Sequence, residues 1–224
     1  MGVDPSPRWI TIDGPGATGK TTTAVALEPL LAAAGHHVLR TQQPSRSPFG
    51  AYVRNALRTL DGLPLACVIT ADRYQHVHTE ILPALAGGQT VICDRYVASL
   101  ALDMLRGVPE QLMWDLHAGL PRPDLAVILS SSPDALETRI AARGPHSRWQ
   151  AEPGNASREI RAYQAASATL AAMDWPLLQL HTDHTPPTAL ADRIASTLER
   201  LPIPRPRDYR ASTEAPGPPS PPAA

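Results

Sequence analysis

The chain has 224 residues, of which 43% are hydrophobic and 18% charged, and this composition is typical of one compact globular domain with a sizeable core. Its 20 basic and 21 acidic residues leave a net charge of −1, so no basic excess indicates binding to nucleic acid or to a membrane surface. The first residues lack a signal-peptide core and no apolar run could span a bilayer, so we expect a cytoplasmic protein with Cys67 and Cys93 buried and reduced.

Short apolar runs rich in strand-forming residues alternate with longer helical patterns along the chain. The expected strands are 9–12, 37–40, 90–93, 125–129 and 177–180. The expected helices are about 19–34, about 65–85, one that begins at Pro133, and 187–201. This alternation predicts one α/β domain over residues 1–201 with a mostly parallel sheet, and such sheets bind ligands at the carboxyl ends of their strands. The proline-rich segment 202–224 is predicted to be a disordered tail.

The segment after the first predicted strand matches the phosphate-loop pattern G-x-x-x-x-G-K-T without a gap, and a predicted helix follows it. Glycines let backbone N–H groups turn toward phosphates, and the helix N-terminus favours negative charge. We expect Lys20 to reach the β- and γ-phosphates of ATP and the Thr21 hydroxyl to ligate Mg²⁺. The alternative is a glycine-rich turn that only happens to precede a lysine. The residues predicted to bind ATP here are Gly14, Pro15, Gly16, Ala17, Thr18, Gly19, Lys20, Thr21 and Thr22.

Asp94, Arg95 and Tyr96 directly follow the third predicted strand. An aspartate at this position can hold Mg²⁺ or orient the acceptor, and the planar arginine fork suits a phosphate. A lone Asp-Arg pair is more often a surface ion pair. Because this pair ends a strand of the same sheet as the phosphate loop, we favour a role in the site.

Three further segments carry arginines. Arg46 follows the second predicted strand, and Arg73 lies on the long predicted helix. Arg143 and Arg148 lie in a polar segment that we expect to form a mobile lid at about 142–153, where arginines would screen the charge of phosphoryl transfer and exclude water. Each of these arginines could instead be an ordinary solvated residue.

Taken in this order, the segments resemble the thymidylate kinase family of P-loop nucleoside monophosphate kinases. The matching segments are 14–22, 44–47, 71–73, 94–96, 123–125 and 143–150. The resemblance runs from about residue 9 to 201. It implies a three-layer fold, in which helices flank a five-stranded parallel sheet and a short lid is present. It also implies that the ATP γ-phosphoryl group is transferred, with Mg²⁺, to a nucleoside 5′-monophosphate by a homodimer.

The resemblance also implies roles for single residues. Arg46 and Arg95 would hold the acceptor phosphate, Arg73 would reach toward the base, and Arg143 would lie near the adenine of ATP. Thr21 and Asp94 would hold the metal. The implied catalytic set is Lys20, Asp94, Arg95 and Arg148. The implied acceptor-binding set is Asp13, Arg46, Ile69, Arg73, Arg95, Tyr96 and Leu102.

The chain departs from the family pattern at several of these positions. The Arg-Glu pair before the proline of the second loop is Gln42-Gln43, and the charged residue inside the phosphate loop is Gly16. Two aromatic positions near the base and the sugar fall at about Ile69 and Leu102, and the acidic residue of the lid is Gln150. An amide can donate hydrogen bonds but cannot act as a base, and an aliphatic side chain loses part of the contact with a flat base. We therefore expect an acceptor other than thymidylate, such as a modified or non-thymine nucleotide.

Two other functions stay open at this point. A P-loop kinase that acts on a nucleoside or on a small non-nucleotide compound would not need Arg46. A nucleotide-binding regulator without turnover would bind ATP but release no ADP in response to an acceptor. Retention of Lys20, Thr21, Asp94 and Arg95 argues against the regulator.

Overall fold

The computed structural model describes residues 5–145 and 147–202. The predicted tail lies outside the described residues except for Pro202, whose backbone oxygen accepts a hydrogen bond from Arg8. Among the helices of the described part, none is both long and apolar enough to cross a membrane.

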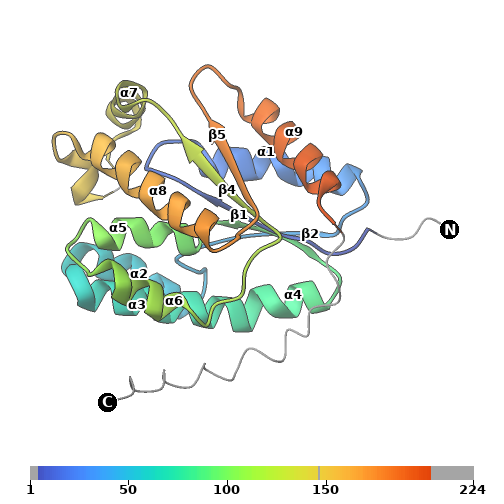
Figure 1. Cartoon of the computed structure of the whole chain (residues 1–224), viewed down its shortest axis with the longest axis horizontal. Coiled ribbons are helices and arrows are strands. Elements are labelled where there is room, and N and C mark those ends of the chain that lie inside the picture. The colour runs from blue at the N-terminus through green and yellow to red at the C-terminus, as the bar shows by residue number, and fades with distance from the viewer. Residues whose placement is uncertain (1–4, 146, 203–224) are drawn as a thin grey trace, which may run out of the picture.

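Five parallel strands form one sheet in the order β2-β3-β1-β4-β5 (Figure 1). All five expected strands are present, and each ends one or two residues later than the sequence indicated. Their bounds are β1 Trp9–Asp13, β2 Val38–Gln42, β3 Thr90–Asp94, β4 Leu125–Ser130 and β5 Leu177–His181.

Helices cover both faces of this sheet, which gives the three layers expected of a P-loop nucleoside monophosphate kinase (Figure 1). One face carries α1 (Lys20–Ala33) and α9 (Pro187–Arg200), which contact each other closely. The helices of the other face are α3 Gly62–His76, α4 Leu82–Ala86, α5 Ala101–Met104, α6 Glu110–His117 and α8 Asn155–Ala172. Helix α2 (Pro48–Thr59) packs on α3, and α7 (Pro133–Arg143) packs on α8.

The alternating direction of side chains along each strand explains why there is an apolar layer on each face of the sheet. Val91 and Cys93 of β3 pack against the larger helical layer, whereas Ile92 between them packs toward α1 and α9. Successive side chains of a strand point to opposite faces, so a strand buried on both sides is apolar at nearly every position. The free thiols differ from the expectation: Cys93 is buried, but Cys67 on α3 is exposed and that prediction was wrong for it.

The helix predicted over about 65–85 is a continuous run of helical backbone with a π-helical turn at Val77–Ile81. Pro83 follows this turn and lacks a backbone N–H, and its ring would clash with the carbonyl group four residues earlier. A wider turn before the proline relieves both problems, so the chain continues as α4.

Helices α2, α5, α6 and α8 were not predicted. Helix α8 is rich in alanine and polar residues, and its buried side chains include Ala156, Tyr163, Ala166 and Leu170. This stripe is too weak to mark a helix by its hydrophobic period alone. Helix α8 is nevertheless important, because it follows the lid segment and packs beside the phosphate loop.

Candidate active site

The carboxyl ends of three neighbouring strands bring polar side chains together. Asp94 ends β3 and lies in register with Ile12 of β1 on one side and with Gln42 of β2 on the other. Asp13 ends β1, and the phosphate loop follows it directly. Ligands of open α/β sheets bind at this edge, and the motif residues that the sequence singled out lie there.

The phosphate loop needs glycine at two positions. Gly14 has a φ of +143°, and a Cβ built there would lie 2.3 Å from the backbone oxygen of Leu129. Gly19 has a φ of +87° and caps the N-terminus of α1. Both conformations are rarely open to other residues, so the two glycines allow the loop to turn onto the helix N-terminus, where an anion is favoured.

Lys20 is folded back into this loop. Its Nζ donates hydrogen bonds to the backbone oxygens of Gly14, at 2.9 Å, and Pro15, at 2.6 Å. Burial, and then the nearby charge of Arg95, lower the pKa of Lys20 to about 7. Lys20 is also the only lysine in the sequence, so no other ε-amino group can take its place.

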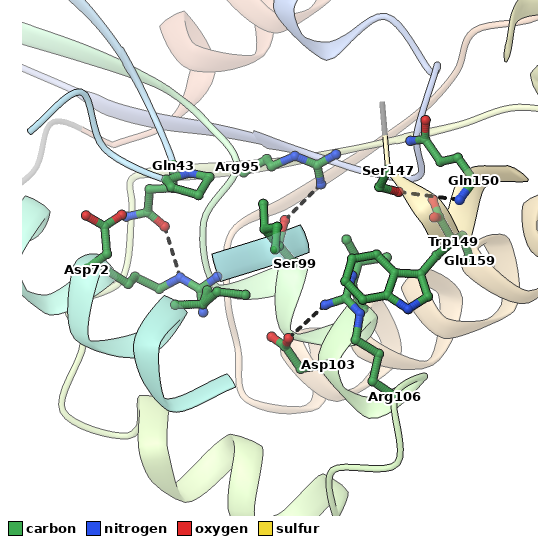
Figure 2. A pocket seen from close by; sticks show the side chains of 15 residues that line it. Gln43, Asp72, Arg95, Ser99, Asp103, Arg106, Ser147, Trp149, Gln150 and Glu159 are labelled. Carbon is green, nitrogen blue, oxygen red and sulfur yellow. Dashed lines mark hydrogen bonds and ion pairs between the residues drawn. The ribbon is translucent and has the colours of Figure 1, made fainter. Parts of the chain in front are cut away.

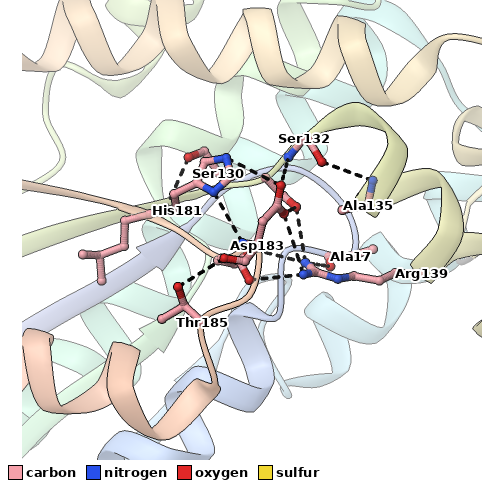
Figure 3. Close-up of polar contacts among 11 residues, drawn as sticks. Ala17, Ser130, Ser132, Ala135, Arg139, His181, Asp183 and Thr185 are labelled. Carbon is pink, nitrogen blue, oxygen red and sulfur yellow. Dashed lines mark hydrogen bonds and ion pairs between the residues drawn. The ribbon is translucent and has the colours of Figure 1, made fainter.

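A second polar network supports the phosphate loop from the ends of β4 and β5 (Figure 3). Arg139 of α7 donates to the backbone oxygen of Ala17 in the loop and to the side chain of Thr182. Asp183 lies within 3.8 Å of the same guanidinium and accepts a hydrogen bond from the backbone N–H of Ser132. Burial opposes ionisation of Asp183, yet the hydrogen bonds from the neighbouring serines lower its pKa to about 2. This network ties α7, which precedes the lid, to the loop.

Thr21 and Asp94, the two residues that the sequence suggests as ligands of a divalent cation, are in direct contact. The Thr21 hydroxyl donates to Oδ2 of Asp94, while Oδ1 of Asp94 is buried and has no hydrogen-bond partner among the described residues. A hard cation such as Mg²⁺ prefers oxygen ligands and keeps several of its ligands as water and substrate phosphates. One hydroxyl and one unsatisfied carboxylate oxygen beside a phosphate loop fit that requirement.

A cavity of about 280 Å³ lies over these residues, and we call it the phosphate cavity. Six of its lining residues belong to the loop and the start of α1, and Arg143 from the lid segment faces them. The full lining is Gly16, Ala17, Gly19, Lys20, Thr21, Thr22, Gln42, Gln43, Asp94, Arg95, Arg143 and Gln150.

Arg95 is held in an unusual backbone conformation at the edge of this cavity, with a φ of +74°. Its N–H donates to the Ile12 backbone oxygen at 2.9 Å, and the next N–H, of Tyr96, donates to Asp13 at 3.0 Å. Left-handed backbone costs energy for a residue with a Cβ and persists where its surroundings fix it. Asp13 therefore helps to fix the turn at Arg95 by accepting the Tyr96 hydrogen bond. Burial raises the pKa of Asp13, although the hydrogen bonds from Ser99 and Tyr96 act to lower it. The Arg95 guanidinium donates to Tyr163 at 3.1 Å.

A second cavity, of about 270 Å³, adjoins the phosphate cavity, and we call it the acceptor cavity after the predicted residues that line it (Figure 2). Gln43, Arg95 and Gln150 line both cavities. The other described residues that line it are Pro44, Leu57, Ile69, Asp72, Arg73, Ser99, Leu102, Asp103, Arg106, Ser147, Trp149 and Glu159.

Arg73 lies on one side of the acceptor cavity with two neutral partners. Its Nε donates to Oε1 of Gln43 at 2.9 Å, and its Nη1 donates to Nε2 of His117. Burial, and then the Arg73 charge, lower the pKa of His117 to about 3, so the ring is neutral at physiological pH. Nδ1 of His117 lies 2.7 Å from the Met113 backbone oxygen, which assigns its proton to that nitrogen and leaves Nε2 to accept from Arg73.

The opposite side of the acceptor cavity is an ion pair covered by the lid. Arg106 donates to Oδ1 of Asp103 at 3.1 Å, and its guanidinium lies 3.7 Å from the centre of the Trp149 ring (Figure 2). Arg148 also contacts this ring, and it forms an ion pair of 2.9 Å with Asp61 at the start of α3. The segment expected to form the lid therefore covers this side of the acceptor cavity, and Arg148 is paired with the residue before α3.

The predicted site residues fall into two groups. The loop residues that line the phosphate cavity, together with Thr21, Asp94, Arg95 and Arg143, are brought together, and Ile69, Arg73 and Leu102 line the acceptor cavity. Seven predicted residues line neither cavity. Of these, Gly14, Pro15 and Thr18 belong to the phosphate loop itself, and Asp13 precedes it. Arg46 is exposed, Arg148 pairs with Asp61, and the buried Tyr96 donates its hydroxyl hydrogen bond to the Pro121 backbone oxygen. Asp13 lies behind Arg95.

Several residues of the site were not found from the sequence. They are Ser99, Asp103, Arg106, His117, Trp149 and Glu159. The one available signal was the three-residue spacing of Asp103 and Arg106 just after the Asp94 segment, which suits an ion pair on a helix. Glu159 lies in a stretch that carries no motif.

A parallel sheet with a phosphate loop at the end of β1, and two adjoining cavities that share an arginine, define a P-loop protein of the nucleotide-kinase type. The family model described as thymidylate kinase matches residues 12–173. The chain therefore belongs to the thymidylate kinase family, as its sequence motifs predicted.

Individual relatives agree with this assignment. The thymidylate kinase of Xanthomonas oryzae pv. oryzae strain PXO99A is 38% identical over 143 residues, which cover 62% of this chain and 63% of that protein. The probable thymidylate kinase of Pyrococcus abyssi is 35% identical over 150 residues, with coverage of 63% and 73%. The thymidylate kinase of Thermomicrobium roseum is 34% identical over 202 residues, with coverage of 86% and 95%. The match to the Xanthomonas protein thus spans less than two thirds of its length, whereas the Thermomicrobium protein is matched almost throughout.

Proposed function

We propose that this protein transfers the γ-phosphoryl group of Mg·ATP to the phosphate of a nucleoside 5′-monophosphate. The observation that carries this proposal is the pair of adjoining cavities that share Arg95. A group bound at the phosphate loop and an anion bound beside Arg95 would meet at this residue. Catalysis of phosphoryl transfer consists mainly of such positioning and of charge stabilisation, so no covalent intermediate is needed.

Five residues around the phosphate cavity have a task in this proposal. Lys20 exchanges its hydrogen bonds with the loop carbonyls for the β- and γ-phosphate oxygens. Thr21 and Asp94 would hold Mg²⁺, which when bound would neutralise charge on the phosphates. Arg143 approaches the donor from the lid, and Arg95 binds the acceptor phosphate. The closed lid excludes water, which would otherwise compete with the acceptor.

The acceptor cavity favours an anionic acceptor over a neutral one. Three arginines line it, against the carboxylates of Asp72, Asp103 and Glu159. Asp72 is already engaged by the Ser45 backbone N–H at 2.7 Å and by the Ser45 hydroxyl. Within the described residues, the hydrogen bonds of the Arg95 guanidinium go to the hydroxyls of Ser99 and Tyr163, which leaves it able to bind an acceptor phosphate at the junction. This geometry supports a monophosphate more than a nucleoside or an alcohol.

The base-binding part of the cavity supports an acceptor other than thymidylate. Leu57, Ile69 and Leu102 supply aliphatic surface, and Trp149 is the one aromatic side chain among its described lining residues. One cation lies against the Trp149 ring at 3.7 Å and a second at 4.6 Å. Base contact therefore relies on aliphatic packing and on the polar edge formed by Arg73, Asp103 and Arg106. We infer a modified or non-thymine base.

The test is ADP release from Mg·ATP with a panel of 5′-monophosphates, the matching nucleosides and small alcohols. The panel includes thymine, uracil, cytosine, adenine and guanine nucleotides and base-modified derivatives. We expect release only with monophosphates, and faster release with at least one of the others than with thymidylate. Release with a nucleoside or an alcohol and with no monophosphate would overturn the proposal. ATP binding without any acceptor-dependent release would indicate the regulator instead.

A further inference from the structure

Helix α8 places a buried carboxylate against the phosphate loop. Glu159 is 6% exposed and lies one turn into α8. Its Oε2 accepts a hydrogen bond from the Gly16 backbone N–H at 2.7 Å, and its Oε1 accepts one from Nδ2 of Asn155 at 2.9 Å. Each carboxylate oxygen therefore has its own donor, one from the loop and one from the first residue of α8.

This contact lies at the boundary between the two cavities. Gly16 lines the phosphate cavity and Glu159 lines the acceptor cavity, with Gln150 of the lid in both. A Cβ built on Gly16 would lie 2.1 Å from Nε2 of Gln150 and 3.5 Å from Oε2 of Glu159. The space that a Gly16 side chain would take is thus filled by Gln150 of the lid segment and Glu159 of α8.

The charge of Glu159 also acts on the cations of both cavities. It favours the protonated forms of Lys20, Arg95, Arg106 and Arg143. These cations come from four separate segments of the chain: the start of α1, the turn after β3, the turn after α5 and the end of α7. Glu159 is therefore a buried carboxylate whose negative charge stabilises all four of these cations at the boundary between the cavities.

We propose that Glu159 is a positioning residue for phosphoryl transfer: it fixes the Gly16 peptide of the phosphate loop from outside the loop and joins the loop to the start of α8, next to the lid. The inference rests on the proposed kinase function. Because Gly16 has no side chain of its own to hold the phosphate loop in place, the hydrogen bond from its backbone N–H to Glu159 of α8 fixes the loop at this position. A misplacement of about 1 Å between reacting groups can cost about a hundredfold in rate, so loss of this contact should lower kcat.

The informative substitution is Glu159→Gln. A glutamine side chain has one acceptor oxygen and one NH₂ group, so it cannot accept from both Gly16 and Asn155. The substitution also removes a negative charge beside the acceptor cavity, which strengthens binding of an anion. We expect kcat to fall by about tenfold or more while the KM for the acceptor does not rise. Loss of local folding would instead raise the KM for both substrates.

A matched control and a rescue separate positioning from a general effect of charge. Glu152 is exposed in the lid segment and pairs with Arg158, so Glu152→Gln makes the same chemical change outside the cavity boundary and should leave kcat within about twofold, because surface ion pairs contribute little. In the double variant Asn155→Asp with Glu159→Gln, the glutamine oxygen can accept from Gly16 while its NH₂ group donates to the new carboxylate. This exchange restores both hydrogen bonds and the net charge, so we expect it to recover most of the lost kcat.

Steady-state kinetics with the best acceptor of the panel, and ATP affinity by calorimetry, are the measurements. Three results would overturn the inference: Glu159→Gln within twofold of the wild type, a loss no larger than in Glu152→Gln, or a double variant as slow as the single one. If the wild-type protein turned over no acceptor at all, the proposed function would fail first. That failure is distinct, because it precedes any comparison of variants.

Discussion

Arg73 of α3 donates a hydrogen bond from Nε to Oε1 of Gln43, on the loop after β2, across 2.9 Å. Both side chains are buried, and the second described partner of Arg73, His117, is neutral as well. A buried cation bonded to neutral acceptors keeps its charge available to a ligand, because charged partners satisfy such a group more fully. The amide at position 43, where the family pattern has a carboxylate, thus leaves Arg73 free to attract an anionic or electron-rich acceptor.

This relationship predicts the effect of Gln43→Glu. A carboxylate at 43 would pair with Arg73 and reduce its attraction for the acceptor, so we expect the KM for the acceptor to rise by about tenfold, equivalent to about 1.4 kcal/mol. The KM for ATP should change much less. Gln164→Glu, which adds the same charge at an exposed position of α8, is the control. An unchanged KM for the acceptor would contradict this account of Arg73.

The single lysine makes the protonation of the phosphate loop directly measurable. Because burial and Arg95 lower the pKa of Lys20 to about 7, this lysine loses its proton near neutral pH in the free protein. Phosphates favour the charged form, so ATP should raise that pKa by roughly one unit or more. ATP affinity should therefore fall as pH rises above 7, since binding must then take up a proton.

Carbon-13 labelling of lysine would give one side-chain signal whose titration reports this pKa with and without ATP. Calorimetry from pH 6 to 9 would report the affinity. A titration midpoint near 10.5, the ordinary value for lysine, in the ATP-free protein would contradict the prediction. Lys20→Ala should lower kcat by about a hundredfold or more. Removal of one preorganised hydrogen-bond donor at the developing charge of a transition state costs about that factor in rate.

The two lid arginines provide a matched pair of substitutions. Arg143 lines the phosphate cavity, whereas Arg148 pairs with Asp61 and lines neither cavity. We expect Arg143→Ala to lower kcat/KM for ATP by about tenfold or more and Arg148→Ala to lower it by no more than about threefold. Steady-state kinetics at saturating acceptor would check both. The reverse order would show that Arg148 turns into the phosphate cavity during transfer, as the family pattern suggests.

Because His117 is held neutral in the folded protein, we expect it to lower the stability of the fold in acid. Its pKa is about 3 in the folded protein against 6.5 for an ordinary histidine, so between these values the unfolded chain takes up a proton that the folded protein does not. The contribution of His117 to the free energy of unfolding is therefore fully present above pH 6.5 and decreases as the pH falls toward 3. His117→Gln should reduce the fall in unfolding free energy between pH 7 and 4.5 by about 2 kcal/mol.

Chemical denaturation of the wild type and the His117→Gln variant at several pH values would measure this difference. His78→Gln, which makes the same chemical change at an exposed position of the chain, is the control. Equal pH dependence in wild type and His117→Gln would show that the histidine is not held neutral by burial and Arg73.

The phosphate loop and the sheet could be predicted because their determinants are local. Gly14 and Gly19 adopt backbone conformations that few other residues allow, and a buried parallel strand is apolar at nearly every position. Both signals are contained in a few consecutive residues. The family motifs added the order of the segments, and the match to the thymidylate kinase family agrees with that order.

The composition of the acceptor cavity depended on contacts between segments far apart in the chain. Glu159 meets Gly16 across 143 positions, and Arg73 meets His117 across 44. No local pattern encodes such a pair. In the sequence, a single polar residue on an alanine-rich helix looks the same whether it is buried or exposed to solvent. The sequence by itself determined that the protein has a phosphate loop on a parallel sheet. Only the tertiary structure decided which charges are paired and which remain for a ligand, because burial and partner geometry set the cost of each charge.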